Sequence, residues 1–229
     1  MIIKGLQKTT LLDFPGKVAC TVFTGGCNFR CPFCHNASLV LSPAELPDLS
    51  EEEFFDFLTK RRGILDGVCI TGGEPLLQKD IIPFLERIRA LGFGIKLDTN
   101  GSFPEKLRQI VDLRLVDYIA MDIKNCREKY DISAGTDSYT DSVFESIEFI
   151  MSCGIPYEFR TTVVKELHTS EDILNIANSI KGANGYFLQV FEDSGELIES
   201  GFSAHDPTTM KEMLELVKPY VRNSALRGV

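Results

Sequence analysis

Three cysteines lie close together near the start of the chain, in the sequence Cys27-Asn-Phe-Arg-Cys31-Pro-Phe-Cys34. The chain has 7 cysteines among 229 residues, an odd number that does not suit a framework of disulfides. Because thiolates are soft ligands, three of them on one short loop can bind a metal centre together. The spacing therefore indicates metal or redox chemistry.

Several kinds of site fit these residues alone. An iron–sulfur cluster held by three cysteines has one iron with an open position, which suits chemistry more than electron storage. Zinc could also use His35, but structural zinc normally takes pairs of ligands from two places, and His35 directly follows Cys34. The spacing from Cys31 to His35 also matches c-type haem attachment and, without the histidine, a dithiol redox motif. Haem attachment is disfavoured because the sequence has no export signal, and a dithiol motif would leave Cys27 without a role. The iron–sulfur cluster is therefore favoured over both, and over inert buried thiols.

Polar or glycine-rich loops follow three other predicted strands. They read Gly72-Gly73-Glu74-Pro75, Asp98-Thr99-Asn100-Gly101 and Asp122-Ile123-Lys124. Ligands of parallel α/β folds bind at the carboxyl ends of the strands, so these loops and the cysteine loop are expected on one rim. Their common position predicts a single shared site and outweighs any one motif, since each loop alone also reads as an ordinary turn or surface ion pair.

The elements that hold these loops alternate between short apolar strands and amphipathic helices. The predicted strands are Lys17–Thr24, Gly67–Thr71, Phe93–Thr99, Tyr118–Ile123, Tyr157–Val164 and Tyr186–Phe191. Several run apolar without alternation, as strands buried on both faces do. The predicted helices follow the capping box at Ser50, cover Asp80–Leu91, Val143–Met151 and Ile173–Ile180, and begin again at Asp206-Pro207.

Strand–helix repetition with short links predicts a parallel sheet. Six units are too few for an eightfold barrel, so we expect an α/β fold with an incomplete (β/α)6 TIM-type barrel, and a doubly wound sheet as the alternative. One domain is predicted for residues 1–229, with core strands over about 17–191 and a C-terminal helix over about 207–220. Residues 36–50 and 124–140 lack periodicity and are expected to be lids or surface loops.

The composition excludes several classes of protein. The net charge is -9, from 33 acidic and 24 basic residues, so the basic footprint that nucleic-acid binding needs is missing. No apolar run approaches the ~18 residues of a membrane span. The first ten residues lack the basic start, apolar core and cleavage site of a signal peptide, which predicts a cytoplasmic protein.

The cysteine spacing, with Phe33 just before the third cysteine, resembles the signature of radical S-adenosylmethionine (SAM) enzymes. The loop Gly72-Gly73-Glu74-Pro75 resembles that superfamily's loop for the methionine amino group. Within the superfamily, Thr10-Leu-Leu-Asp-Phe-Pro-Gly16 and Cys34-His35-Asn36 are similar to the activators of glycyl radical enzymes. The similarity is greatest to activators of anaerobic ribonucleotide reductase and weaker to those of pyruvate formate-lyase.

The resemblance implies a radical SAM activase. In such a protein Cys27, Cys31 and Cys34 hold a [4Fe–4S] cluster, at which SAM is reductively cleaved to take a hydrogen from a glycine of a partner enzyme. The expected partners are a glycyl radical enzyme, most simply an anaerobic ribonucleotide reductase, and a low-potential electron donor of the flavodoxin or ferredoxin type. Neither nucleic acid nor membrane is an expected partner.

The resemblance also implies which residues contact SAM. They are Phe33, His35, Gly72, Gly73, Glu74, Asp98, Thr99, Asn100, Asp122, Ile123, Lys124 and Arg160. Asp98 and Thr99 would meet the ribose or a monovalent cation, and Arg160 the SAM carboxylate. Gln189 stands where some activators have histidine, which leaves any contact from that strand open. His168 and His205 are expected to be solvated, and Cys20 and Cys69 to be small buried residues.

Two other functions fit the sequence. One is a radical SAM enzyme acting on a small molecule, as 7-carboxy-7-deazaguanine synthase does. The other is a non-catalytic metal-binding or electron-transfer module. Conversion of a small substrate without any protein partner would distinguish the first, and zinc content without SAM cleavage would distinguish the second.

Overall fold

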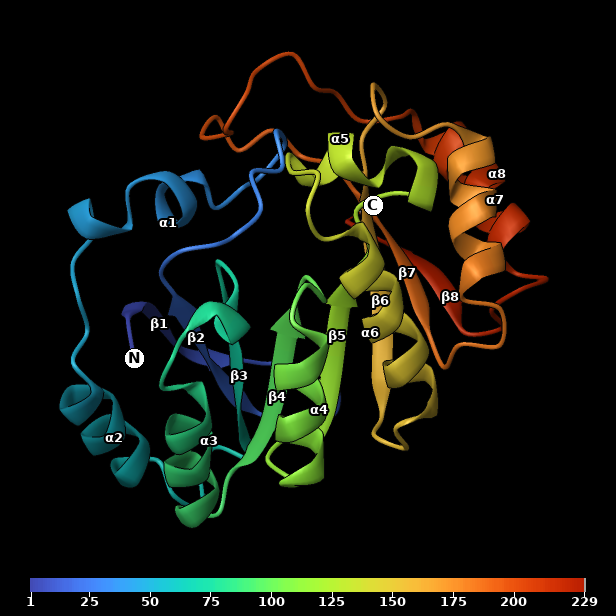
Figure 1. Cartoon of the computed structure of the whole chain (residues 1–229). Helices are drawn as coiled ribbons and strands as arrows, with labels where there is room; N and C mark the ends of the chain where they lie inside the picture. The colour runs from blue at the N-terminus through green and yellow to red at the C-terminus, as the bar shows by residue number, and fades with distance from the viewer. Residues whose placement is uncertain (229) are drawn as a thin grey trace.

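The computed structural model describes residues 1–228, whose strands form one eight-stranded sheet (Figure 1). Each strand is hydrogen-bonded to its neighbours in chain order, from β1 at one edge to β8 at the other. The strands are β1 (Ile3–Thr10), β2 (Ala19–Thr24), β3 (Gly67–Gly72), β4 (Gly94–Thr99), β5 (Tyr118–Asp122), β6 (Tyr157–Val163), β7 (Tyr186–Val190) and β8 (Ser224–Arg227). The six predicted strands are β2 to β7, so the parallel α/β architecture is confirmed.

Two edge strands extend the predicted sheet. β8 pairs with β7 in the parallel sense, as do all neighbouring pairs from β2 onward, whereas β1 is antiparallel to β2. The sheet curves without β1 meeting β8, so it forms an incomplete barrel with one open side (Figure 1). Register pairs Thr24 with Gly72 and Asp122 with Arg160, which brings the carboxyl ends of neighbouring strands together.

Helices connect the strands and cover the outside of the sheet, with α3, α4 and α6 in front of the strands in Figure 1. The helices are α1 (Ala37–Leu41), α2 (Glu51–Lys60), α3 (Ile81–Ala90), α4 (Pro104–Asp112), α5 (Tyr130–Ala134), α6 (Thr140–Ser152), α7 (Ser170–Ser179) and α8 (Pro207–Val217). The predicted capping box at Ser50 is present, with the Ser50 hydroxyl accepting from Glu53 N. No helix in residues 1–228 combines the length and apolar character that a bilayer span requires.

Neither stretch without periodicity is simply a surface loop. Residues 36–50 contain α1 and a short 3₁₀ turn. Residues 124–140 contain α5 and bury Tyr130, Ser133 and Ala134. The expectation of a surface lid is therefore wrong for the second stretch, because the packing of Tyr130 and Ala134 against the cysteine loop fixes its position.

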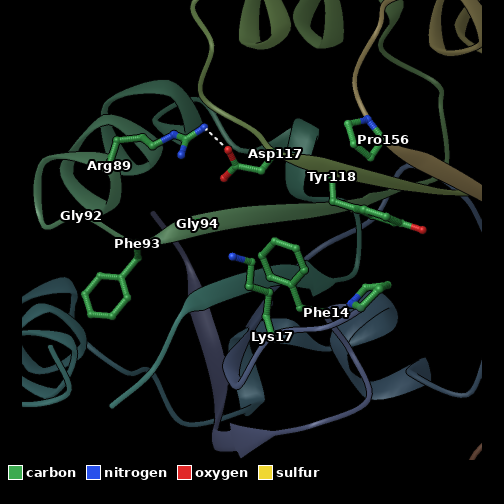
Figure 2. Close-up of a pocket in the computed structure, with 10 residues that line it drawn as sticks. Phe14, Lys17, Arg89, Gly92, Phe93, Gly94, Asp117, Tyr118 and Pro156 are labelled. Atoms are coloured by element: carbon green, nitrogen blue, oxygen red, sulfur yellow. Dashed lines mark hydrogen bonds and ion pairs between the residues drawn. The ribbon is translucent and has the colours of Figure 1, made fainter. Parts of the chain in front are cut away.

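The amino ends of the strands are covered by the segment from Thr10 to Gly16. Phe14 is buried with its ring centroid 6.3 Å from that of Tyr118. A Cβ atom on Gly67, the first residue of β3, would lie 2.8 Å from Phe14 Cε1, so glycine is needed beside this ring. Figure 2 shows both rings lining a pocket of about 490 Å³ at this base, together with the ion pair of Arg89 and Asp117.

The last strand is held by a buried carboxylate. Arg227 of β8 donates two hydrogen bonds, of 2.7 and 2.8 Å, to the carboxylate of Glu158 on β6. Glu158 also accepts from the Tyr118 hydroxyl at 3.1 Å. Burial alone would raise the pKa of Glu158, but its bonds to Arg227 lower the pKa below its usual value. This pair therefore ties β8 to the interior of the sheet.

Replacing Arg227 with methionine should lower the free energy of unfolding by about 2 kcal/mol at pH 7. A buried pair that loses one partner costs more, but Arg227 is 38% exposed and solvent screens part of the charge. In the wild-type protein the ion pair stabilises the fold fully at pH values above about 4.3, the pKa of Glu in the unfolded chain. This stabilisation is lost as the pH falls through the lower pKa that Glu158 has in the folded protein. The deficit should therefore shrink towards pH 3, which urea denaturation across this range would measure; a deficit independent of pH would contradict the assignment.

Candidate active site

The cysteine loop follows β2 and is supported by the end of α5. Arg30 N donates to the carbonyl of Ala134 at 2.9 Å, and Cys34 N donates to the carbonyl of Cys31 at 3.0 Å. Gly135 has a φ of +65° after α5, and a Cβ atom there would lie 2.1 Å from Arg30 O. The loop and the α5 terminus thus pack backbone against backbone, which only glycine at position 135 allows.

The thiols of Cys27, Cys31 and Cys34 are partly shielded from solvent and lie near the positive charge of Lys124. All three are free; Cys31 is 7% exposed, while Cys27 and Cys34 are half-buried. Burial raises the pKa of Cys27 to about 11 and that of Cys31 to about 12, whereas the charge of Lys124 lowers both. Burial alone would lower the pKa of Lys124, but the neighbouring Asp122 and thiols outweigh the effect of burial and raise this pKa. A bound metal, together with Lys124, would supply the positive charge that thiolates need here.

This donor set fits an iron–sulfur cluster. Among residues 1–228, no three His, Cys, Asp or Glu side chains are grouped as they would be around a single metal ion. In a cubane cluster each cysteine binds a different iron, so the three sulfur atoms need not meet at one point. Cys27, Cys31 and Cys34 present soft ligands from one loop, as such a cluster requires.

A polar pocket of about 220 Å³ lies at the carboxyl ends of the strands. Its lining comes from the loop after β2, from the carboxyl ends of β3, β4 and β5 with the first residues after β3 and β4, and from β6 and β7. The lining residues are Asn36, Thr71, Gly72, Gly73, Asp98, Thr99, Asn100, Asp122, Arg160 and Gln189. The structure therefore brings together most of the residues that the sequence predicts to contact SAM, and it adds Gln189, whose role the sequence leaves open.

Gly72 and Gly73, at the carboxyl end of β3, are required by their packing against the end of β2 and the loop that follows it. Gly73 N donates to Thr24 O and Glu74 N to Gly26 O, both at 2.9 Å. A Cβ atom on Gly73 would lie 2.0 Å from Gly26 O, and one on Gly72, where φ is +118°, would lie 2.2 Å from Thr24 N. This close contact, as well as any contact with a ligand, explains why glycine occupies both positions.

Replacing Gly73 with alanine should displace this loop from the cysteine loop. Overpacking of this kind typically costs about 2 kcal/mol, so the unfolding free energy of the metal-free protein should fall by that amount and SAM binding should weaken. Urea denaturation and equilibrium binding would measure the two effects. Gly5→Ala is the matched control, because its Cβ atom would meet Phe23 at an ordinary 3.4 Å; equal stability of the two variants would contradict the packing argument.

Glu74 is fully buried and is not among the residues that line the pocket. It accepts hydrogen bonds from Thr99 Oγ1 at 2.9 Å, from Asn100 N at 2.7 Å and from Leu76 N at 3.0 Å. Burial raises the pKa of Glu74 to about 7, although these donors act in the opposite direction. Its carboxylate therefore fixes the loop after β4 relative to the loop after β3.

A string of side chains of alternating charge runs along the lining of the pocket. Arg160 donates from Nε to Asp122 at 2.8 Å and from Nη1 to Asp98 at 3.1 Å. Lys124 extends the string beyond Asp122, and Lys96 pairs with Asp98 at its other end. Burial would raise the pKa of both aspartates, but the neighbouring cations lower it, so both carboxylates are ionised at neutral pH.

The other predicted contacts do not line the pocket. Phe33 is buried with its ring edge-on to His168, His35 is exposed and packs on Phe191, and Ile123 is a fully buried core residue. The expectation that His168 is solvated is wrong. Its Nε2 lies 2.8 Å from Lys124 O and its Nδ1 bonds to the Val164 backbone, so it fixes the loop that carries Lys124.

His205 is half-buried, and its Nε2 lies 2.8 Å from the carbonyl of His168. Cys20 and Cys69 are buried within their strands, as predicted.

A second pocket, of about 590 Å³, lies on the open side of the barrel. It shares Arg160 and Gln189 with the rim pocket, so the two spaces adjoin. Its lining includes Leu11 and Leu12, which follow β1 and are 71% and 90% exposed, and Arg227 of β8. The rim site is therefore reached from the side through the gap between the two edges of the sheet.

Comparison with known proteins agrees with this arrangement. Residues 21–180 match the family model described as the radical SAM superfamily. A protein of Methanocaldococcus jannaschii assigned as a glycyl-radical enzyme activating enzyme is 30% identical over 100% of this chain and 96% of its own length. The pyruvate formate-lyase-activating enzyme of Clostridium pasteurianum is 30% identical over 78% of this chain and 76% of its own length.

A solved structure shows the same fold. The domain of a pyruvate-formate lyase-activating enzyme from Bacteroides vulgatus superimposes with a TM-score of 0.60 at 16% identity, over 71% of this chain and 99% of that domain.

Proposed function

The chain belongs to the radical SAM superfamily and to its glycyl-radical-enzyme activating group, and from this we propose that it installs a glycyl radical on a partner protein. Cys27, Cys31 and Cys34 would hold a [4Fe–4S] cluster. When bound, the cluster and SAM supply reductive cleavage of SAM and removal of a hydrogen atom from the substrate. The single observation that carries the proposal is that the three-cysteine loop adjoins a polar rim pocket, which shares Arg160 and Gln189 with the lateral pocket.

The rim residues have the chemistry that SAM requires. Backbone carbonyls after β3 would accept from its ammonium group, and Thr99 and Asp98 offer oxygen atoms for its ribose or for a monovalent cation. Arg160 keeps guanidinium hydrogens beyond those it gives to Asp98 and Asp122, which suits a carboxylate ligand. Lys124 beside the thiols adds positive charge where the carboxylate would approach the cluster.

The open side favours a polypeptide substrate. The lateral pocket of about 590 Å³ reaches Arg160 from outside the barrel and so admits an extended loop from another protein. Such a loop would also exclude water from the site, which a reactive radical requires. We propose an anaerobic ribonucleotide reductase as this partner, a flavodoxin or ferredoxin as the electron donor, a cytoplasmic location, and a single domain over residues 1–229.

The test is anaerobic reconstitution with iron and sulfide, followed by dithionite and SAM. The proposal expects 5′-deoxyadenosine and methionine, and a glycyl-radical signal in electron paramagnetic resonance when the reductase is added. Zinc content without 5′-deoxyadenosine would contradict the enzymatic function. SAM cleavage coupled to a small molecule, with no radical on the reductase or on pyruvate formate-lyase, would favour the small-molecule function instead.

A further inference from the structure

We infer that the Asn100 side-chain amide donates a hydrogen bond to the Cys27 sulfur and thereby raises the reduction potential of the cluster. Asn100 Nδ2 lies 3.8 Å from Cys27 Sγ. The inference rests on the proposed function, because it concerns the cluster that the cysteine loop would hold. It assigns to Asn100 a role in electron transfer, separate from any contact with SAM.

The hydrogen bonds around Asn100 fix which way its amide points. Ser102 N, which can only donate, lies 2.9 Å from Asn100 Oδ1, so the oxygen must be on that side. The Ser102 hydroxyl donates to the same oxygen at 2.6 Å and accepts from Asn28 Nδ2 at 2.9 Å. Asn100 Nδ2 in turn donates to Asn28 Oδ1 at 3.1 Å. The donors and acceptors in this ring of hydrogen bonds are consistent with one another in this arrangement. It leaves the second hydrogen of Asn100 Nδ2 to bond Cys27 Sγ.

The backbone holds Asn100 in this position. Its N–H donates at 2.7 Å to the buried carboxylate of Glu74, which also binds Thr99. Asn100 itself is buried, and its ring of bonds includes Asn28, the residue directly after Cys27. The donor is therefore preorganised and held from both sides, so it does not have to reorient when the cluster changes charge.

The direction of the effect follows from the charge on sulfur. Reduction adds one electron to the cluster and increases the negative charge that the thiolates share. A hydrogen-bond donor binds the more negative sulfur more strongly. It therefore stabilises the reduced cluster and raises the reduction potential. Phe29 N already donates to Cys27 Sγ at 3.4 Å, and Asn100 provides a second donor that comes from a different loop.

The experiment measures the reduction potential of the reconstituted cluster without SAM, by redox titration followed with electron paramagnetic resonance. The variants are Asn100→Ala, which removes the donor, and Asn100→Asp, which keeps the shape but replaces the donor with an acceptor. Removing one such bond should disfavour reduction roughly fivefold, which corresponds to a potential more negative by roughly 40 mV. The aspartate variant should shift further in the same direction.

Two controls separate this role from a general loosening of the loops. Ser102→Ala opens the ring but keeps the donor, and Asn36→Ala removes an amide that bonds Gly72 O on the same rim but no sulfur. Both should retain the wild-type potential. An unchanged potential in the Asn100 variants, an equal shift in the controls, or loss of cluster iron from both Asn100 variants alone would overturn the inference. Absence of a cluster from the wild-type protein would instead contradict the proposed function.

Discussion

Replacing Cys31 with alanine should abolish cluster binding and SAM cleavage while leaving the fold intact. Two thiolates cannot hold the three irons that the loop is expected to ligate, and alanine offers no replacement ligand. Cys31 is buried, but the change is small and removes a weak thiol bond of 3.7 Å to the Ala134 carbonyl. Iron and sulfide content, absorbance and 5′-deoxyadenosine production should therefore fall to background, with an unchanged circular dichroism spectrum.

The matched control for this variant is Cys153→Ala. Cys153 is half-buried after α6, and its thiol bonds the carbonyl of Ile150 at 3.4 Å. This variant should bind a full complement of iron and cleave SAM normally. Normal SAM cleavage by the Cys31 variant would show that the ligand assignment is wrong, whatever the control does.

Replacing Arg160 with methionine should have the second largest effect. It leaves the carboxylates of Asp98 and Asp122 facing each other, with only Lys96 and Lys124 at the two ends of the string. Breaking a buried ion pair in this way costs about 3–5 kcal/mol. We expect a loss of that order in the unfolding free energy of the metal-free protein, together with loss of SAM binding, measured by urea denaturation and calorimetry.

The pH dependence of the unfolding free energy shows whether the broken ion pairs cause the loss of stability in the Arg160 variant. Both aspartates have lowered pKa values in the folded protein, so their contribution to stability is present above the unfolded pKa of about 3.9 and is lost as the pH falls through the folded values. The deficit of the methionine variant should therefore shrink below pH 4, where the unpaired carboxylates become protonated. Arg108→Met, which removes an exposed pair with Glu145, should cost about 0.5 kcal/mol at most. A pH-independent deficit would point to lost packing instead.

The central sheet could be predicted because its strands are buried on both faces. β2 and β3 are rich in apolar residues and bury five and four of their six residues respectively. β1 has no such pattern, since it lies at an edge and exposes Gln7, Lys8 and Thr9. β8 has only four residues, all half-buried, which is too short for any periodicity to show. α4 did carry a local signal that the predicted helices omitted, since Pro104 begins the helix and Leu107 and Ile110 lie on one face of it.

The site could be predicted as a set of loops but not as a set of contacts. The position of each loop after a strand was enough to place Gly72, Asp98 and Asp122 around one pocket. The burial of His168 was not predictable, because it depends on Phe33 and Lys124, which are far from it in sequence. The same holds for Glu74, whose partners come from the next strand unit. Local patterns carry no information about such long-range partners.

The agreement between strand order and chain order has a consequence for biogenesis. A chain emerging from the ribosome adds each strand to an edge that already exists, without inserting one between two others. The cysteine loop packs on Gly73 and Gly135, which precede β6, but its Phe33 and the adjoining His35 pack on His168 and Phe191, which follow it. We therefore expect iron to be loaded only after β7 has joined the sheet.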